Sequence, residues 1–394
     1  MRQHIKRIAE PFLSFFQQEA GSGILLLLCA VLAIFLANSP WADNYEHLLH
    51  TPLAVGFGSW SLELGLLHWI NDGLMAVFFF VIGLEIKREF LYGELRTRSS
   101  MLLPVGAAMG GMILPALFYL ALNYGQETMA GWGIPMATDI AFALGIMTLA
   151  ARQAPLGLVI FLTALAIVDD LGAIVVIALC YSGEVSAPAL LIGILFLLLA
   201  LGMNRLRSSF LPGYLLCGAL AWLSFFHAGI HPTIAGVLLG FAIPAEAEPE
   251  HSLLHRLEHA LEPWSAYGIM PVFALANAGV PVSFSQFDFS SPIFLGILAG
   301  LCLGKPLGIA GVVWLLHRSA GVSVPGNAAS GQLAATGMLG GIGFTMSIFI
   351  ASLAFPDPEW LAIAKWSILA ASVLSGLAGA MVFQWISYRT TQSE

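Results

Sequence analysis

The sequence predicts an all-α polytopic membrane protein with about twelve transmembrane helices. It also predicts inverted three-helix repeats, two broken helices that cross at mid-membrane, and a small outer β-hairpin. Three observations carry these predictions: the composition, the placement of basic residues, and charges inside apolar segments. Hydrophobic residues make up 58% of the 394 residues, charged residues 10%, and mean hydropathy is +0.87. Because so few charges cannot cover a soluble surface, residues 1–394 are expected to form a single transmembrane domain.

The composition also excludes several classes of protein. A net charge of −8 without a basic run argues against nucleic-acid binding, and the apolar content argues against a disordered chain. The four cysteines stand singly in apolar stretches, so we interpret them as packing residues with no redox or metal role. No cofactor is expected.

The predicted spans follow from the length of apolar segments, since a helix needs about 20 apolar residues to cross a bilayer. The first is expected to be a retained span, not a cleaved signal peptide. The seventh and eighth predicted spans, 211–225 and 229–243, are short. The twelve segments are 15–37, 66–86, 101–122, 129–150, 156–181, 188–204, 211–225, 229–243, 253–277, 293–316, 332–355 and 361–385.

Basic residues orient these spans. With the N-terminus in the cytoplasm, the outer loops near 38–60, 123–128, 182–187, 226–228, 278–292 and 356–360 contain no Lys or Arg. Thirteen of the fifteen basic residues then fall at cytoplasmic ends or loops, and only Lys305 and Lys365 lie inside spans. This positive-inside pattern, with an even number of spans, predicts that both termini are cytoplasmic.

The first outer loop has strand character over residues 51–65. Apolar residues alternate on either side of Gly58-Ser59, a pair that suits a two-residue hairpin turn. Val55 would then face Leu62, and Phe57 would face Trp60. Because an exposed hairpin can extend a partner's sheet, we hypothesise a homodimer contact through residues 53–64. A loop lying on lipid is the alternative.

Four ionisable residues fall at similar depth inside predicted spans: Asp139, Asp169, Asp170 and Lys305. Charges at mid-membrane are costly and rare, which makes them functional candidates. A single one could be a satisfied structural group. Three carboxylates and one lysine at a common depth indicate a functional site.

Two of the spans are poorly suited to continuous helices. Gly133 and Pro135 precede Thr138 and Asp139 in the fourth span, and residues 337–345 of the eleventh are rich in glycine. Interrupted spans in each half of a chain point to a transporter site between repeats, here 101–181 (spans 3–5) and 293–385 (spans 10–12). Half-helix N-termini carry partial positive charge and C-termini partial negative charge. Asp139 could compensate the first and Lys305 the second.

The adjacent pair Asp169 and Asp170 suggests ion binding. Neighbouring residues on a helix point about 100° apart, so one carboxylate could face a cation pathway and the other a neighbouring helix. Na⁺ or Li⁺ prefers oxygen ligands, to which the Thr138 hydroxyl and backbone carbonyls could add. A carboxylate that binds either a proton or a cation gives exchange, which predicts a cation/proton antiporter, a secondary transporter and not an enzyme.

Other classes fit less well. An intramembrane aspartyl protease needs a GxGD motif, a membrane zinc protease needs HExxH, and neither occurs. Twelve spans with a Lys305-Pro306 pair do not suit a retinal pump. A structural scaffold would tolerate loss of Asp170. The serious alternative is a sodium-coupled symporter of an organic solute, in which protons do not compete with Na⁺.

Five stretches of the chain are similar to a known family. They are WINDGLMAVFF (69–79), ATDIAFA (137–143), ALAIVDDLGAI (164–174), GKPLG (304–308) and GIGFTMSIFIA (341–351). Together they resemble the NhaA family of sodium/proton antiporters, and the similarity runs from about residue 15 to 385. Because inverted repeats are a known feature of this family, the repeat interpretation and the resemblance are not independent.

The resemblance implies a bacterial inner-membrane protein that exchanges cytoplasmic Na⁺ or Li⁺ for external protons. Exchange would be electrogenic, with more than one proton per sodium. Asp169 and Asp170 would be the cation- and proton-binding pair, while Thr138 and Asp139 would lie at the helix crossing. Lys305 would compensate helix ends and pair with Asp169. Whether this lysine also carries a transported proton stays open.

The resemblance also implies activation at alkaline pH. The candidates for this response are Glu85, Glu89, His231, Glu258, His259 and Glu262, with His251 and His255 on the same helical face. A solvated charged face is the alternative interpretation for these groups. At position 262 the family commonly has histidine, so Glu262 could shift the pH midpoint. Asp72, near the outer end of the second span, is a candidate for the exit pathway.

Overall fold

A computed structural model describes residues 21–57, 60–151, 154–246, 252–281 and 289–392. The chain divides into two compact units. Unit 1 comprises Met1–Leu28, Thr97–Ala173 and Val282–Glu394, and unit 2 comprises Cys29–Arg96 and Ile174–Pro281.

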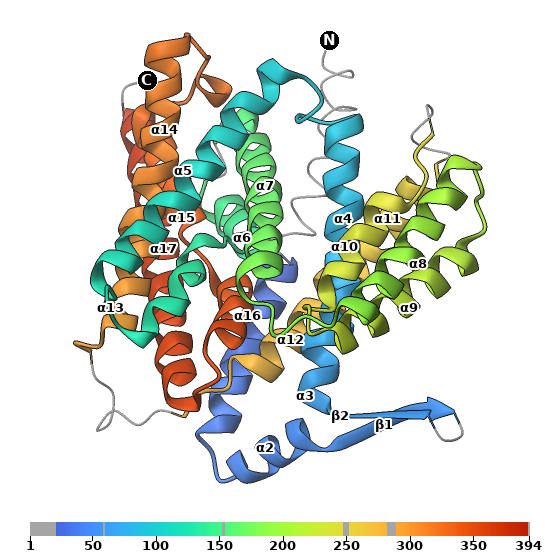
Figure 1. Cartoon of the computed structure of the whole chain (residues 1–394). Coiled ribbons are helices and arrows are strands. Elements are labelled where there is room, and N and C mark those ends of the chain that lie inside the picture. The colour runs from blue at the N-terminus through green and yellow to red at the C-terminus, as the bar shows by residue number, and fades with distance from the viewer. Residues whose placement is uncertain (1–20, 58–59, 152–153, 247–251, 282–288, 393–394) are drawn as a thin grey trace. The chain divides into compact units, whose positions relative to one another are not determined.

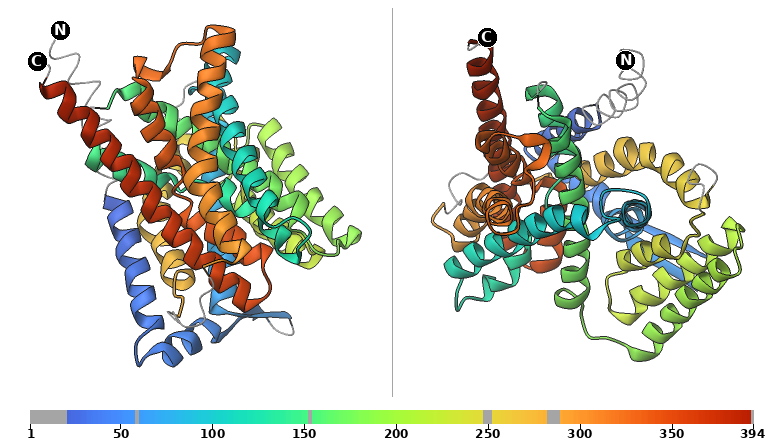
Figure 2. Two further views of the ribbon diagram at one scale, coloured as in Figure 1. Left: turned by 90° about the vertical axis from the view of Figure 1, so that its left-hand side faces the viewer. Right: turned by 90° about the horizontal axis from the view of Figure 1, so that it is seen from above.

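Unit 1 contains two segments with the same order of elements: a long helix, a bent helix pair, and a second long helix (Figure 1). The first is α5 (Arg98–Leu122), the 3₁₀ helix η2 (Glu127–Met136) with α6 (Ile140–Ala150), and α7 (Leu156–Cys180), which continues past Ala173 into unit 2. The second is α13 (Pro292–Ala299), the π-helical turn η5 (Gly300–Gly304) and α14 (Lys305–Ala320), then η6 (Pro325–Asn327), α15 (Ser330–Gly340) with α16 (Phe344–Ala354), and α17 (Pro358–Gln392). Figure 2 shows α17 as one long rod. The two pairs bend by 45° and 43°.

Helices α5 and α14 approach each other closely because glycines line their contact. A Cβ atom on Gly110 would overlap the carbonyl oxygen of Gly308, and one on Gly308 would overlap that of Gly110. Small residues at such a crossing let two backbones touch, as in many membrane helix pairs. This contact fixes α14, the helix that begins at Lys305, against the first segment of unit 1.

Unit 2 begins inside the first helix, described as Gly21–Ala37, which bends by 112° into α2 (Ala42–His50). Strands β1 (Pro52–Phe57) and β2 (Trp60–Gly65) pair antiparallel, with Val55 opposite Leu62 and Phe57 opposite Trp60 as predicted. The predicted Gly58-Ser59 turn lies outside the described residues.

The remaining elements of unit 2 are helical. They are α3 (Leu66–His68), the π-helical η1 (Trp69–Leu74), α4 (Met75–Leu91), α8 (Ala187–Arg205), α9 (Leu211–Ala228), α10 (Thr233–Ala242), α11 (Leu253–Trp264), the π-helical η4 (Ser265–Ile269) and α12 (Met270–Asn277).

Every predicted span has a helical counterpart among the described residues. Seven helices are long and apolar enough to cross a membrane, and the three bent pairs raise this number to ten. The other two predicted spans correspond to α10, which has only ten residues, and to the run from α11 to α12. Helix α11 is not itself an apolar span, because two histidines, an arginine and two glutamates lie within its twelve residues. The predicted fold class is confirmed, whereas the boundaries of the inverted repeats stay a prediction.

Candidate ion-binding site

The two helix breaks of unit 1 lie against each other. The backbone N–H of Asp139, in the first break, donates to the carbonyl of Ile342 in the second at 2.6 Å. The Thr138 hydroxyl donates to the carbonyl of Gly340, the last residue of α15, at 2.9 Å. The two breaks thus supply hydrogen-bond partners for each other's polar groups. Such partners are needed because unpaired backbone groups are costly where water is absent.

Asp139 accepts hydrogen bonds from the N-termini of two helices. Its Oδ1 accepts from the N–H of Phe142 in α6 at 3.1 Å. Its Oδ2 accepts from the N–H of Thr345 in α16 at 3.1 Å and from the Thr345 hydroxyl at 2.5 Å. A carboxylate placed between two helix N-termini offsets the partial positive charge of both.

Lys305 lies at the opposite kind of helix end. Its side chain is fully buried and donates to the carbonyl of Met136, the last residue of η2, and to Oδ2 of Asp169. The π-helical turn η5 directly precedes this lysine, and Pro306 follows it. The ammonium group therefore meets both a partial negative helix end and a carboxylate.

Asp169 and Asp170 lie on α7 and are only 1% and 2% exposed. The side chain and backbone of Thr138 interact with Asp169, and Lys305 interacts electrostatically with Asp170. Oδ1 of Asp169 is buried and has no hydrogen bond to the described residues. The structure therefore brings Thr138, Asp139, Asp169, Asp170 and Lys305 together around the two breaks.

This set of groups suits a hard cation better than a transition metal. It offers carboxylate, hydroxyl and backbone carbonyl oxygens, which are the ligands that hard cations prefer. Within the described part of the chain, no group of three or more His, Cys, Asp and Glu residues could hold a metal ion.

Sequence reasoning missed two hydroxyl groups beside the breaks. Thr345 bonds Asp139, as described above, and the buried Ser347 hydroxyl donates to the carbonyl of Ile134 at 2.8 Å. A threonine at the second position after the Gly343 N-cap of α16 was a usable signal, because N–H groups there lack partners within the helix.

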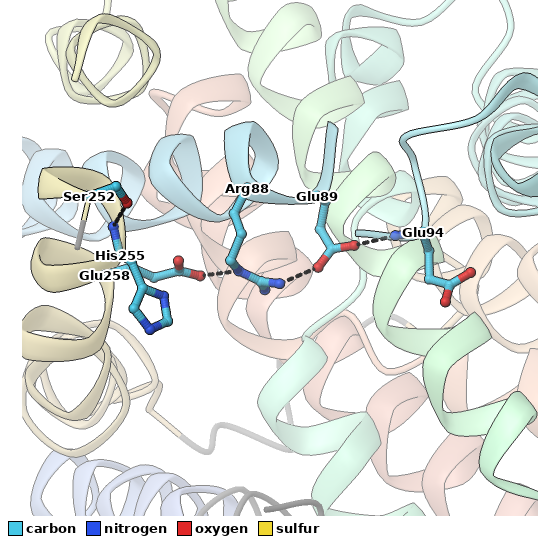
Figure 3. A network of polar contacts seen from close by, with 6 residues as sticks. All are labelled: Arg88, Glu89, Glu94, Ser252, His255 and Glu258. Carbon is cyan, nitrogen blue, oxygen red and sulfur yellow. Dashed lines mark hydrogen bonds and ion pairs between the residues drawn. The ribbon is translucent and has the colours of Figure 1, made fainter. Parts of the chain in front are cut away.

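A second polar cluster lies in unit 2 and is centred on Arg88 of α4 (Figure 3). The Arg88 guanidinium contacts Glu89 Oε1 at 2.6 Å and Glu258 Oε1 of α11 at 2.7 Å. Glu89 Oε2 also accepts from the N–H of Glu94 at 3.0 Å. Both Glu89 and Glu258 are buried. Arg88, which the sequence placed only in the positive-inside pattern, is therefore the link between two predicted pH-response residues.

The other predicted members of this cluster lie around it. Glu85 interacts electrostatically with Arg88, and the rings of His255 and His259 stack at 6.3 Å between centroids. His251 lies outside the described residues. Burial and the neighbouring Glu258 raise the pKa of Glu262 on α11, while Arg88 and His259 oppose this rise.

Asp72 and His231 come together elsewhere in unit 2. His231 Nδ1 lies 3.9 Å from Asp72 Oδ1 and 3.4 Å from the Thr233 hydroxyl. The Trp222 indole N–H donates to the backbone carbonyl of Asp72 at 2.9 Å. The predicted pH-response residues therefore occupy two places, and His231 contacts the predicted pathway residue instead of the Arg88 cluster.

Comparison with known proteins covers nearly the whole chain. The family described as Na⁺/H⁺ antiporter 1 matches residues 13–383. The Na⁺/H⁺ antiporter NhaA 2 of Clostridium beijerinckii is 48% identical, over 99% of this chain and 98% of its own. The NhaA antiporter of Tolumonas auensis is 48% identical over 94% of both chains, and that of Oleidesulfovibrio alaskensis is 45% identical over 97% of this chain and 95% of its own.

Proposed function

The chain belongs to the Na⁺/H⁺ antiporter 1 family, and we propose that it exchanges Na⁺ or Li⁺ for protons at Asp169 and Asp170. It is a multi-pass membrane protein and a secondary transporter, not an enzyme. The observation that carries the proposed mechanism is the buried Asp169–Asp170 pair beside two crossed helix breaks, with one carboxylate held by Lys305.

The ion pair between Lys305 and Asp169 supports a site that binds either a cation or protons, but not both at once. A cation that approaches the carboxylates competes with the Lys305 ammonium for Asp169, and a proton competes for the same oxygens. Because the side chains of Lys305 and Asp169 are fully buried, water cannot screen this competition. Each half of the transport cycle therefore carries either the cation or protons, and never both together.

The pair of carboxylates also supports the proposal that exchange is electrogenic. Two carboxylates can accept two protons, whereas one Na⁺ with its oxygen ligands fills the site. Exchange of two protons for one Na⁺ moves net charge across the membrane, so the membrane potential would drive transport. An imposed potential, negative inside, is expected to accelerate Na⁺ efflux from vesicles that contain only this protein.

We also propose that exchange is activated at alkaline pH and that the Arg88 cluster is responsible. Arg88, Glu89 and Glu258 join α4 to α11, and the ionisable side chains of Glu85, His259 and Glu262 lie beside them. A change in protonation there alters the attraction between the two helices. His231 would act separately, through Asp72 in the exit pathway.

The placement of basic residues supports both termini in the cytoplasm, and the similarity to bacterial NhaA antiporters supports an inner-membrane location. The hairpin supports a homodimer, because β1 and β2 form a two-stranded sheet by themselves and Leu53 and Val55 are exposed. Such a sheet can be extended by a second copy. Deletion of residues 53–64 is expected to convert dimers to monomers in size-exclusion chromatography with light scattering.

Everted membrane vesicles from a host without its own antiporters test the central proposal. Respiration acidifies their interior, and a pH-sensitive dye reports whether added Na⁺, Li⁺ or K⁺ drives protons out. We expect a response to Na⁺ and Li⁺ that rises with pH in the wild type. Asp170→Asn is expected to abolish it, because an amide can neither release a proton nor neutralise a cation.

Two controls separate this proposal from the alternatives. Lys365→Met changes a lysine of α17 outside the proposed site and should leave the response intact. Liposomes that contain only the purified protein and no organic solute should still exchange Na⁺ for protons, whereas a sodium-coupled symporter would not. No cation response at any pH, with the protein inserted, would overturn the antiport proposal.

A further inference from the structure

Lys87 is a charged residue of α4 that the ion-binding site and the Arg88 cluster do not use. Its ammonium donates to the carbonyl of Phe241 at 2.8 Å and to the carbonyl of Ile243. Both carbonyls lie at the C-terminal end of α10, where the last carbonyl groups have no partner within the helix. Lys87 therefore caps α10 from a neighbouring helix, and its positive charge offsets the partial negative charge there.

Helix α10 packs tightly against α4. Glycines line the middle of this contact: a Cβ atom on Gly83 would lie 2.6 Å from the carbonyl oxygen of Val237, and one on Gly240 would lie 2.8 Å from the backbone of Gly83. At the other end, His231 just before α10 approaches Asp72 in η1, which continues into α4. The pair is thus fastened at the Lys87 end and packed backbone to backbone in its middle.

Lys87 and Arg88 direct α4 toward two different helices. Adjacent residues on a helix point about 100° apart, so Lys87 reaches α10 while Arg88 reaches Glu258 of α11. We propose that Lys87 is a positioning residue that fastens α10 to α4, so that a change at the Arg88 cluster moves α4 and α10 together. The coupling to the pH response rests on the function proposed above, whereas the fastening itself does not.

In this proposal the charged and titratable groups near the cytoplasmic end of α4 act on Arg88, and Lys87 transmits the resulting movement to α10. On α4 they are Glu85, Arg88 and Glu89, and from α11 they are Glu258, His259 and Glu262. Tyr92, just after α4, donates to the carbonyl of Glu246 beyond α10. Lys87 need not lose its proton for this coupling to operate. Its ammonium must keep its two carbonyl partners while the neighbouring carboxylates change charge.

Hydrogen–deuterium exchange of the full-length protein in lipid nanodiscs tests the fastening. Lys87→Met keeps the aliphatic stem and removes the donor, so amide exchange in the last turn of α10 should accelerate about tenfold, the effect of losing a hydrogen bond to a charged group. Lys87→Arg should restore slow exchange. Lys365→Met, a matched loss of one lysine in unit 1, should leave α10 unchanged.

Antiport in vesicles tests the coupling. Lys87→Met should shift the pH midpoint of Na⁺-dependent proton movement, and Lys87→Arg should bring it back. Wild-type exchange at α10 in Lys87→Met would overturn the fastening, and faster exchange with an unchanged midpoint would overturn the coupling. If the wild type itself moves no protons in response to cations, the proposed function fails while the exchange result can still be interpreted.

Discussion

Asp139→Ala is expected to destabilise the crossing of the two broken helices. The substitution removes the acceptor of the Phe142 N–H and of both donors of Thr345. Loss of an N-cap costs about 1 kcal/mol, and a buried N–H left without a partner costs about 1–3 kcal/mol more. The threonine hydroxyl can rotate to another acceptor and adds little. The sum is a loss of about 2–4 kcal/mol in the free energy of unfolding.

Two further variants test this value. Asp139→Asn keeps an oxygen for Phe142 but points an amide donor at the Thr345 N–H, so its loss should lie between the wild type and the alanine variant. Thr345→Val removes only the hydroxyl and should cost about 1 kcal/mol.

Thermal unfolding of the purified protein in detergent, followed by tryptophan fluorescence, ranks the variants. We expect the midpoint to fall from wild type through Thr345→Val and Asp139→Asn to Asp139→Ala. An alanine variant as stable as the wild type would refute the double cap. An asparagine variant no more stable than alanine would show that the charge, and not the acceptor geometry, is what matters.

Three other variants probe contacts elsewhere in the two units. Lys305→Ala leaves the Asp169 carboxylate buried without its cation and should cost about 3–5 kcal/mol; Lys305→Ala with Asp169→Ala should recover part of this loss in thermal unfolding while antiport stays absent. Gly308→Ala should destabilise the contact of α14 with α5 because its Cβ meets the Gly110 carbonyl. Gly311→Ala, on the same helix but with open space around it, should instead raise the free energy of unfolding by about 0.5–1 kcal/mol. A Gly308→Ala variant as stable as the wild type would contradict this packing. Since the folded-state pKa of Glu262 is raised, its stabilising contribution is present at low pH and is lost as pH rises from the ordinary value of 4.5 through the raised pKa. Glu262→Gln should therefore match the wild type in thermal stability at acid pH and exceed it at alkaline pH. A constant difference at all pH values would rule out this titration.

The fold could be predicted from sequence because the bilayer restricts the choices. Apolar length located most spans to within a few residues, and glycine and proline located both breaks. It did not predict α2, which lies in a segment expected to be an outer loop, or the extension of α17 to Gln392. The π-helical turns before Met75 and Lys305 could not be predicted in this way, because they shift hydrogen-bond register without changing the apolar pattern. The charges that keep α11 from being an apolar span are visible in the sequence, yet the length of the segment 253–277 favoured a span.

The role of the candidate ion-binding residues stays a prediction, and sequence anticipated only some of their contacts. Charge at mid-membrane identified Asp139 and Lys305, but sequence spacing could not pair Asp139 with Thr345, 206 residues away. Nor could it show that Arg88 joins Glu89 to Glu258, since an arginine near a cytoplasmic helix end has an ordinary topological explanation. Long-range pairing depends on packing, which one sequence does not display.

Because Asp139 caps both α6 and α16, its hydrogen bonds cannot all form until late in the synthesis of the chain. At synthesis rates of about 5–20 residues per second, Thr345 leaves the ribosome roughly 10–40 seconds after Asp139. Throughout that interval the break after η2 lies in the bilayer while the Asp139 N–H, its Oδ2 and the Thr138 hydroxyl await partners in residues 340–345 that are not yet translated. The nascent protein must therefore shelter this polar break with water or with other proteins, and chains that stop before residue 330 should be recognised by membrane quality control as unfinished.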